Sequence, residues 1–334
     1  MSVKLISIGD VMPGENVHHF NRGMIRKYNH RYPDLVDDGV KQLLNEADLL
    51  ILNLESAIAP EDYISRRNIQ NGVYIAPENS LQLIGQLNRN VVANVANNHF
   101  GQHGTAIAET AKQLIRQKGI RITGVDNSPC TLSLNGMLIN IWGVSLVEDR
   151  HECGAYFKSS YDRLISDLNT GVKAENEFRI ISIHWGEEYY TLSNERQHKL
   201  AEKLAESGFD LVLGHHPHVI QPFERIGNTG VIFSHGNFLF DQNFSRLTQK
   251  GLISVFNLPD TNPNLLFSQQ KGFRVTGTEP VSSKGLAGYC KSNYSRRKPT
   301  IMRIKMKLEL LFHFYDLNGP VIRTFFSRFF RKAK

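Results

Sequence analysis

The sequence predicts a layered α/β fold. Short apolar runs with β-strand character alternate with stretches of helical periodicity along most of the 334 residues. The apolar runs are continuous, which is typical of strands that are buried on both faces. Such strands need helices to cover them, so we expect sheets buried beneath helices. The chain is long enough for one large or two modest domains with a substantial core.

Each predicted element follows from its local pattern. In the first part of the chain, continuous apolar runs predict strands at 3–8 (VKLISI), 48–53 (DLLILN) and 91–96 (VVANVA), and helical spacing predicts helices at 36–46, 78–89 and 105–118. Further along, strands are predicted at 137–144 (MLINIWGV), 179–185 (RIISIHW), 210–214 (DLVLG) and 230–236 (GVIFSHG), with a helix at 194–207. Residues 258–272 are polar and turn-rich, and 292–299 have linker composition. We therefore expect a domain of residues 1–285, in which a strand extension follows a core of about 1–257, and a separate basic tail of residues 286–334.

Positive charge is concentrated in this tail. The formal net charge is +7, from 39 Lys and Arg against 32 Asp and Glu. Residues 291–334 hold 12 of the basic residues and two acidic ones, a balance of +10, which leaves −3 for the first 290 residues. A slightly acidic main body is not built to bind a polyanion, so we expect no nucleic-acid partner.

Potential metal ligands follow the predicted strands where each strand ends. They are Asp10 in GDVMPG, Glu55 in NLES, Asn98 and His99 in ANNH, His184 in HWGEEY, and His215, His216 and His218 in GHHPH. In layered α/β folds the loops at the carboxyl ends of strands converge, so these side chains are expected to form one site. Imidazole combined with carboxylate and amide oxygen suits Zn, Mn or Fe, and we expect one or two divalent transition-metal ions.

Such a site can support hydrolysis. A carboxylate can bridge two metal ions, and two ions about 4 Å apart can bind a phosphoryl group and activate a water in line with its leaving group. His99, beside the ligand candidate Asn98, would be free to protonate the departing oxygen as a general acid. The substrate predicted from this chemistry is a phosphoester, with an amide as the second choice.

Each motif also has a purely structural interpretation. Asp10 could form a turn or a helix cap, and Glu55 could be an exposed loop carboxylate. Asn97 and Asn98 could cap the helix that follows them, and His184 could be a hydrogen-bonded histidine of the core. The GHHPH motif is harder to explain in this way, because three imidazoles around a stiff proline have little structural purpose.

Six motifs in order make the sequence resemble the CapA family, the poly-γ-glutamate capsule synthesis proteins, whose fold belongs with calcineurin-like metallophosphoesterases. The motifs are GDVMPG, NLES, ANNH, HWGEEY, GHHPHVIQP and SHGNFLFDQ, within residues 3–242. Each motif alone is unspecific, whereas the ordered series is specific. The resemblance implies a four-layer α/β/β/α sandwich of two mixed sheets flanked by helices. It also implies a role in making a capsule or another anionic surface polymer, either poly-γ-glutamate or a polysaccharide.

The resemblance further assigns roles to individual residues. It implies Asp10 and His218 at a first metal, Glu55 bridging both metals, Asn98, His184 and His216 at the second metal, and His99 as the catalytic residue facing the substrate. His215 occupies a position that the family fills variably and is left out of the ligand set. Glu188, Asn237 and Asp241 match family motifs and would contact the substrate or the ligands, although the last two could instead organise a tight turn.

Two positions depart from the family patterns. Metallophosphoesterases commonly begin DxH, and this chain has Met12 in place of that histidine, so the first metal is one ligand short. The CapA pattern continues from NNH to an Asp where this chain has Gln102, and a neutral amide supports the basicity of an imidazole less than a carboxylate does. His103 could partly substitute or could be solvated. These departures favour a second hypothesis, a catalytically silent accessory protein that binds a nascent polymer or its synthase and keeps the metal for structure.

The tail ends in a predicted amphipathic helix within residues 319–334. Its phenylalanines share one helical face and arginines flank them. This helix could contact an acidic membrane surface or the synthase, or it could dock on the protein's own core. No segment reaches the roughly 20 apolar residues that cross a bilayer, and the N-terminus lacks the apolar run of a secretory signal. The expected location is cytoplasmic, at the inner membrane face if the tail binds lipid.

Overall fold

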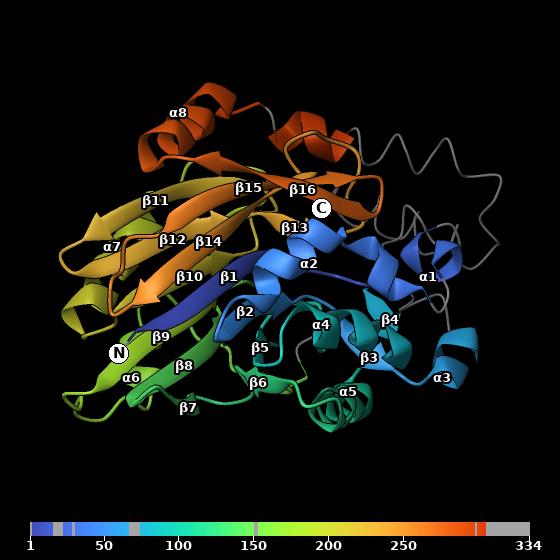
Figure 1. Ribbon diagram of the computed structural model, residues 1–334, viewed down its shortest axis with the longest axis horizontal. Helices are drawn as coiled ribbons and strands as arrows, with labels where there is room; N and C mark the ends of the chain where they lie inside the picture. Colours follow the sequence, from blue (N-terminus) through green and yellow to red (C-terminus); the bar gives the residue numbers. More distant parts are fainter. Residues whose placement is uncertain are drawn as a thin grey trace, which may run out of the picture.

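Two large β-sheets lie face to face in the computed structural model, with helices on both outer sides (Figure 1). The structure describes residues 2–15, 23–28, 31–66, 74–149, 153–297 and 299–304. This arrangement confirms the predicted four-layer α/β/β/α sandwich of mixed sheets. The predicted amphipathic helix of residues 319–334 lies outside the described residues. Among the helices of the described chain, none combines the length and the apolar character needed to cross a membrane.

The first sheet has the strand order β16-β15-β14-β1-β2-β5-β6, with β13 beside β1. Its strands are β1 (Val3–Val11), β2 (Leu49–Leu54), β5 (Val91–Asn94), β6 (Arg121–Thr123), β13 (Asn237–Leu239), β14 (Lys250–Leu258), β15 (Asn264–Lys271) and β16 (Arg274–Val281). Strands β1, β2, β5 and β6 run parallel, so their carboxyl ends meet at one edge. Strands β14, β15 and β16 extend the sheet by antiparallel pairing.

The second sheet has the order β11-β12-β10-β9-β8-β7. Its strands are β7 (Cys130–Leu134), β8 (Met137–Ser145), β9 (Glu177–His184), β10 (Leu211–His215), β11 (Ile220–Ile226) and β12 (Thr229–His235). The four central strands are parallel and the two edge strands are antiparallel to their neighbours. A separate pair is formed by β3 (Ala57–Ala59) and β4 (Ile75–Pro77).

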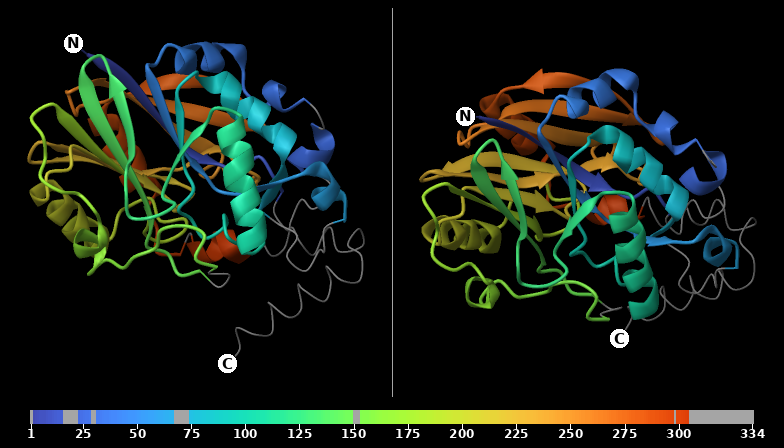
Figure 2. Two further views of the ribbon diagram at one scale, coloured as in Figure 1. Left: turned by 90° about the horizontal axis from the view of Figure 1, so that it is seen from below. Right: turned by 60° about the horizontal axis from the view of Figure 1, so that its bottom comes forward.

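Helices cover the outer faces of both sheets, except α8 (Ser283–Asn293), which packs against β11 and the layer between the sheets. They are α1 (Met24–Lys27), η2 (Tyr32–Leu35), α2 (Asp38–Asn45), α3 (Glu61–Arg66), η4 (Glu78–Ser80), α4 (Leu81–Leu87), α5 (Thr105–Gln117), α6 (Leu164–Asp167), α7 (Glu195–Glu206) and α8 (Ser283–Asn293). Helices α2, α4 and α5 pack on the first sheet, and α6 and α7 pack on the second, so they lie on opposite sides of the strands (Figure 2).

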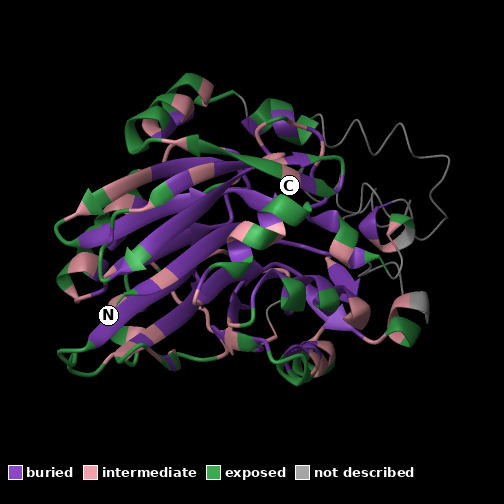
Figure 3. Ribbon diagram, in the orientation of Figure 1, coloured by how far each residue is buried: buried purple, intermediate pink, exposed green. Residues whose placement is uncertain are grey.

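Side chains of the strands alternate between two apolar layers. Leu49 and Ile51 of β2 face the other sheet, whereas Leu50 and Leu52 face the helices. Every residue of β2 is buried, and Figure 3 shows the same burial along the central strands of both sheets. This two-sided burial explains why the sequence carries continuous apolar runs instead of an alternating pattern.

The strands and helices predicted within residues 3–236 are all present, but the sequence pattern missed several strands. The segment 258–272 was expected to be turn-rich, and it contains β15. Its polar composition is misleading because Gln270 is buried, donating to the carbonyl of Phe240 at 2.7 Å and accepting from its N–H at 2.9 Å. Strands β6, β7 and β11 were also not predicted. The boundary drawn at residue 285 falls inside α8, whose Leu286 and Cys290 are buried in the layer between the sheets.

A buried ion pair at the start of β9 predicts how stability depends on pH. Arg179 Nε donates to Glu177 Oε1 at 2.7 Å, and Asn140 Nδ2 donates to the same oxygen at 2.8 Å. Burial opposes ionisation of Glu177, but the hydrogen bonds from Arg179 and Asn140 lower its pKa from 4.5 to about 2. The pair therefore contributes fully above pH 4.5, and its contribution is lost as the pH falls toward 2.

We expect Glu177→Gln to lower the free energy of unfolding by about 3 kcal/mol at neutral pH, because it leaves the buried Arg179 without its counter-charge. The deficit should shrink as the pH falls through the window given above, since the wild-type carboxyl is then protonated as well. Urea denaturation at a series of pH values measures this. A deficit that does not change with pH would contradict the assignment.

Candidate metal site

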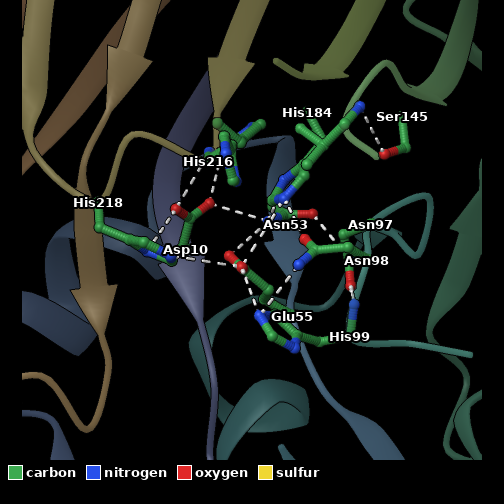
Figure 4. A network of polar contacts seen from close by, with 12 residues as sticks. Asp10, Asn53, Glu55, Asn97, Asn98, His99, Ser145, His184, His216 and His218 are labelled. Atoms are coloured by element: carbon green, nitrogen blue, oxygen red, sulfur yellow. Dashed lines mark hydrogen bonds and ion pairs between the residues drawn. The ribbon is translucent and has the colours of Figure 1, made fainter. Parts of the chain in front are cut away.

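Side chains from the carboxyl ends of five strands meet at one end of the sandwich. The first sheet supplies Asp10 from β1, Glu55 after β2 and Asn98 after β5, and the second supplies His184 from β9 and His216 and His218 after β10. Figure 4 shows the two carboxylates at the centre, with the imidazoles and the Asn98 amide around them. The structure thus brings together all six residues that the sequence proposed as ligands.

Glycines allow close backbone contacts beside this site, one between β1 and the junction of β12 with β13 and one between β10 and β12. A Cβ atom on Gly9 would overlap the carbonyl oxygen of Gly236, and one on Gly214 would overlap the carbonyl oxygen of Phe233. Gly236, at φ 64°, also lets the chain leave β12 in the second sheet and enter β13 in the first. The close approach of the backbones therefore depends on the absence of side chains at these positions.

Replacing Gly214 with alanine tests this close approach. We expect Gly214→Ala to lower the free energy of unfolding by about 3 kcal/mol, because backbone atoms of two adjacent strands would have to move apart. Gly85 in α4 is the matched control, since a Cβ atom there meets nothing within 4 Å. Gly85→Ala should be neutral or stabilising by up to about 1 kcal/mol. Equal melting temperatures for the two variants would contradict the packing argument.

The ligand atoms form two overlapping clusters. Glu55, His184 and His216 form one, and Asp10, Glu55 and His218 form the other, with the ligand atoms of each cluster within 4.8 Å of one another. All five side chains are buried. Glu55 belongs to both clusters, as expected of a carboxylate that bridges two cations.

The atoms facing the centre fit a cation. Glu55 Oε1 lies 3.7 Å from His184 Nε2 and 3.6 Å from His218 Nε2, too far for hydrogen bonds but suitable for shared coordination. Within the described part of the chain, this buried oxygen and the buried Nδ1 of His216 have no hydrogen-bond partner. A buried polar atom without a partner is costly, and a divalent ion would satisfy both. The clusters are therefore compatible with a divalent metal.

Burial controls the protonation of Glu55. Burial raises its pKa well above the ordinary value, and the negative charges of Asp10 and Glu188 raise it further. Without a cation the folded chain therefore favours the protonated carboxyl. A metal ion would displace this proton, so metal affinity should increase with pH.

Two of the imidazoles and Asp10 are held in the forms that bind metals, whereas burial opposes protonation of His218 but its hydrogen bond with Asp10 raises its pKa. Burial lowers the pKa of His184 well below its ordinary value and that of His216 to about 3, and neighbouring imidazoles add to both shifts. Burial opposes ionisation of Asp10, but hydrogen bonds with His215 and His218 lower its pKa well below the ordinary value. Neutral imidazole and ionised carboxylate are the ligand forms.

Asn53 organises the site, although the sequence analysis did not single it out. Its Nδ2 lies 2.8 Å from Asp10 Oδ1, 3.3 Å from Glu55 Oε2 and 3.4 Å from His184 Nδ1. It is the polar residue that ends the apolar run LLILN, and it stands two residues before Glu55. A polar side chain at the end of a fully buried strand was the signal that could have identified it.

The two asparagines of ANNH have different roles. Asn98 Oδ1 lies 2.9 Å from His184 Nε2, which places it beside the cluster of Glu55, His184 and His216. Asn97 Nδ2 donates to Asn53 Oδ1 at 3.2 Å, and Asn97 Oδ1 accepts from the backbone N–H of His99 at 3.2 Å. The alternative that these asparagines cap the next helix is wrong, because the N-cap of α5 is Gly104 and has no side-chain cap.

His99 faces the bridging carboxylate and is held on two sides. Its Nε2 lies 3.7 Å from Glu55 Oε1, and its Nδ1 lies 2.9 Å from Gln102 Oε1. The ring stacks on Tyr74, with centroids 3.5 Å apart. Gln102 therefore supplies an oxygen that orients the imidazole but no negative charge. His103, considered as a substitute, instead packs edge-on against Tyr63.

His218 and His215 contact different partners in the GHHPH loop. His218 Nδ1 lies 3.0 Å from Asn237 Oδ1, so Asn237 contacts a ligand candidate. His215 Nδ1 lies 3.1 Å from Asp10 Oδ1, its ring stacks on His235, and His215 belongs to neither cluster. Positive φ angles at His216 (96°) and His218 (57°) make the sharp turn that aims both rings inward.

The remaining predicted residues surround this centre. Asp241 is fully buried just after β13. Glu188 is partly exposed, and its Oε2 lies 3.8 Å from Arg303 Nε. Met12, in place of the DxH histidine, is buried in the apolar layer beneath the helices and cannot act as an imidazole ligand.

These features define a class of protein, an α/β/β/α sandwich whose buried carboxylate and histidine clusters are compatible with a divalent metal. The sequence matches the family model "Bacterial capsule synthesis protein PGA_cap" over residues 4–242, and the chain belongs to this family. The match includes all six motifs and confirms the resemblance drawn from them.

Two relatives carry the name CapA. "Capsule biosynthesis protein CapA" of Bacillus anthracis is 24% identical over 292 residues, which cover 83% of this chain and 69% of the relative. "PGA biosynthesis protein CapA" of Bacillus subtilis (strain 168) is 25% identical over 259 residues, which cover 74% of this chain and 65% of the relative. The chain thus spans about two thirds of the length of these relatives.

Solved structures with similar folds have low sequence identity. A protein of Thermus thermophilus gives a TM-score of 0.47 at 13% identity, covering 79% of this chain and 98% of that one. The 5'-nucleotidase from Candida albicans SC5314 gives 0.42 at 11% identity, covering 92% of this chain and 57% of that one.

Proposed function

We propose that this chain is a metal-dependent hydrolase that acts in the biosynthesis of a bacterial capsule or related surface polymer. Membership of the capsule synthesis family supports the role in polymer biosynthesis. The observation that carries the hydrolase proposal is the shared position of Glu55 in two buried clusters of ligand atoms. A phosphoester is the substrate that this arrangement favours, with an amide as the less favoured alternative.

The residues would divide the work as follows. Bound divalent ions would polarise the scissile group and lower the pKa of a water molecule. Glu55, Asp10 and the three imidazoles of the clusters would hold these ions. His99, oriented by Gln102 and stacked on Tyr74, would give a proton to the leaving oxygen from the side of the bridging carboxylate.

A combined measurement of metal content and hydrolysis tests this proposal. Purified protein should bind Mn²⁺, Zn²⁺ or Fe²⁺ and should hydrolyse a phosphodiester or phosphomonoester in a metal-dependent way. His216→Ala should lose both properties while its far-UV circular dichroism stays native. His198→Ala is the matched control, because this histidine lies on α7 beside Ser193 and Glu224, outside the clusters. Metal-loaded protein that turns over no phosphoester or amide would overturn the hydrolase proposal.

One observation favours the accessory function as a second candidate. Met12 leaves three side chains, Asp10, Glu55 and His218, at the first metal position. If only the cluster of Glu55, His184 and His216 held an ion, the metal could stabilise a polymer-binding surface without catalysing hydrolysis. Bound metal at one ion per chain, raised thermal stability and no turnover would support this candidate.

A further inference from the structure

An arginine from beyond the matched family region lies next to the loops of the metal site. Residues 299–304 form a helical turn, and Met302 of this turn is buried with Tyr189, Val219 and Phe244. Tyr189 belongs to the HWGEEY loop and Val219 directly follows His218. The backbone N–H of Tyr189 donates to the carbonyl of Pro217 at 2.8 Å, which joins these two loops. The turn is therefore anchored on both loops.

This anchor places the charge of Arg303 near the site. Arg303 Nε lies 3.8 Å from Glu188 Oε2, with the two side chains 47% and 37% exposed. Glu188 in turn is near enough for its charge to raise the pKa of Glu55 and His218. The positive charge of Arg303 likewise contributes to the lowered pKa of His216. Arg303 is thus a partly exposed cation beside the two loops that carry His184, His216 and His218.

The guanidinium keeps its hydrogen-bonding capacity. Its contact with Glu188 is longer than a hydrogen bond, and no other described residue bonds to it. A guanidinium presents several N–H donors in a planar fork that matches the two oxygens of a carboxylate or phosphate. A fork that is held in place but not saturated is suited to an anionic ligand.

We infer that Arg303 forms an oxyanion-binding position at the mouth of the metal site. The inference rests on the proposed function and narrows its substrate class. The substrate carries a phosphate or carboxylate group next to the one that the metal centre receives, as a repeating anionic polymer does. Glu188 is an ion-pair partner of the guanidinium with which the anion would compete, so the loss of Glu188 should strengthen anion binding.

Calorimetric titration of the full-length, Mn²⁺-loaded protein tests the inference with two probes. Tripolyphosphate represents a phosphate-type polyanion and oligo-glutamate a carboxylate-type one. Arg303→Ala should weaken the binding of at least one probe about tenfold, and the probe affected identifies the type of oxyanion. Arg303→Lys should recover part of the loss, because it keeps the charge but not the fork. Arg297→Ala, an exposed arginine near the same turn, should bind like wild type.

The outcomes separate this inference from the hydrolase proposal. Weaker binding by Arg303→Ala at unchanged metal content supports the inference even if no substrate is hydrolysed. Unchanged binding by Arg303→Ala overturns it, whether or not the protein is an active hydrolase. Failure of the wild type to bind either probe also overturns it. Glu188→Gln should bind the affected probe more tightly. Weaker binding would contradict the idea that the anion replaces Glu188 as the partner of Arg303.

Discussion

Glu55→Gln is expected to lower the affinity for Mn²⁺ by at least about 100-fold and to remove the rise in melting temperature that the metal gives the wild type. The reason is that Glu55 belongs to both clusters of ligand atoms, so its replacement removes a charged ligand from each. Metal analysis after dialysis and calorimetric titration measure the loss. In the proposed hydrolase Glu55 would bridge the two ions, so turnover should also fall by about three orders of magnitude.

Without metal, the same Glu55→Gln substitution should stabilise the protein. Burial and the charges of Asp10 and Glu188 hold the pKa of Glu55 well above 4.5, so the unfolded chain ionises at a pH where the folded chain still holds the proton. The stability of the metal-free protein therefore falls as the pH rises above 4.5. Glutamine cannot ionise, so metal-free Glu55→Gln should be the more stable protein at neutral pH.

The partly exposed Glu188 provides the control for this experiment. Glu188→Gln removes a nearby negative charge but no cluster ligand, so its metal stoichiometry should equal that of the wild type. If Glu55→Gln kept its full metal content, the bridging assignment would be wrong. A metal-free variant less stable than the wild type at neutral pH would contradict the raised pKa of Glu55.

His99→Ala is expected to keep the metal content of the wild type and to lose about 100- to 1,000-fold in turnover. His99 lies beside the clusters without belonging to either, so its removal should not release the ions. A general acid matters most when the leaving oxygen is a poor leaving group. The loss should therefore be large for an alkyl phosphoester and small for a p-nitrophenyl ester.

The neighbouring histidine is the control in this case. His103→Ala alters the same loop, but its ring packs against Tyr63 and should leave turnover unchanged. Gln102→Glu provides a complementary measurement, since a carboxylate at the Nδ1 of His99 favours the protonated imidazole. The alkaline limb of the pH–rate profile should move to higher pH. Equal losses for both leaving groups in His99→Ala would contradict proton donation.

The sequence predicted the central strands and the candidate ligands that lie at the ends of those strands. Apolar runs located the central strands, and the polar residues after them supplied the candidates. The family resemblance then selected from these the six side chains that the structure brings together. The contributions of Asn53 and Tyr74 could not be predicted in this way, because each depends on neighbours that are distant in the chain. Strand β15 was missed for a similar reason, since its buried Gln270 is satisfied by the backbone of Phe240, directly after β13.

The first sheet supplies the oxygen ligands and the second sheet the imidazole ligands, and this is also the order in which the ribosome makes them. The six proposed ligands come from both parts of the chain: Asp10, Glu55 and Asn98 supply oxygen atoms, and the imidazoles of His184, His216 and His218 all come later. A chain emerging from the ribosome therefore presents hard oxygen donors first, which suit Mg²⁺ or Ca²⁺ as well as a transition metal. The three imidazole ligands join the oxygen ligands only after β9 and β10 have been added to the sandwich. The site for a divalent ion would thus be complete only late in synthesis, and a chain truncated before β9 would lack all three imidazole ligands.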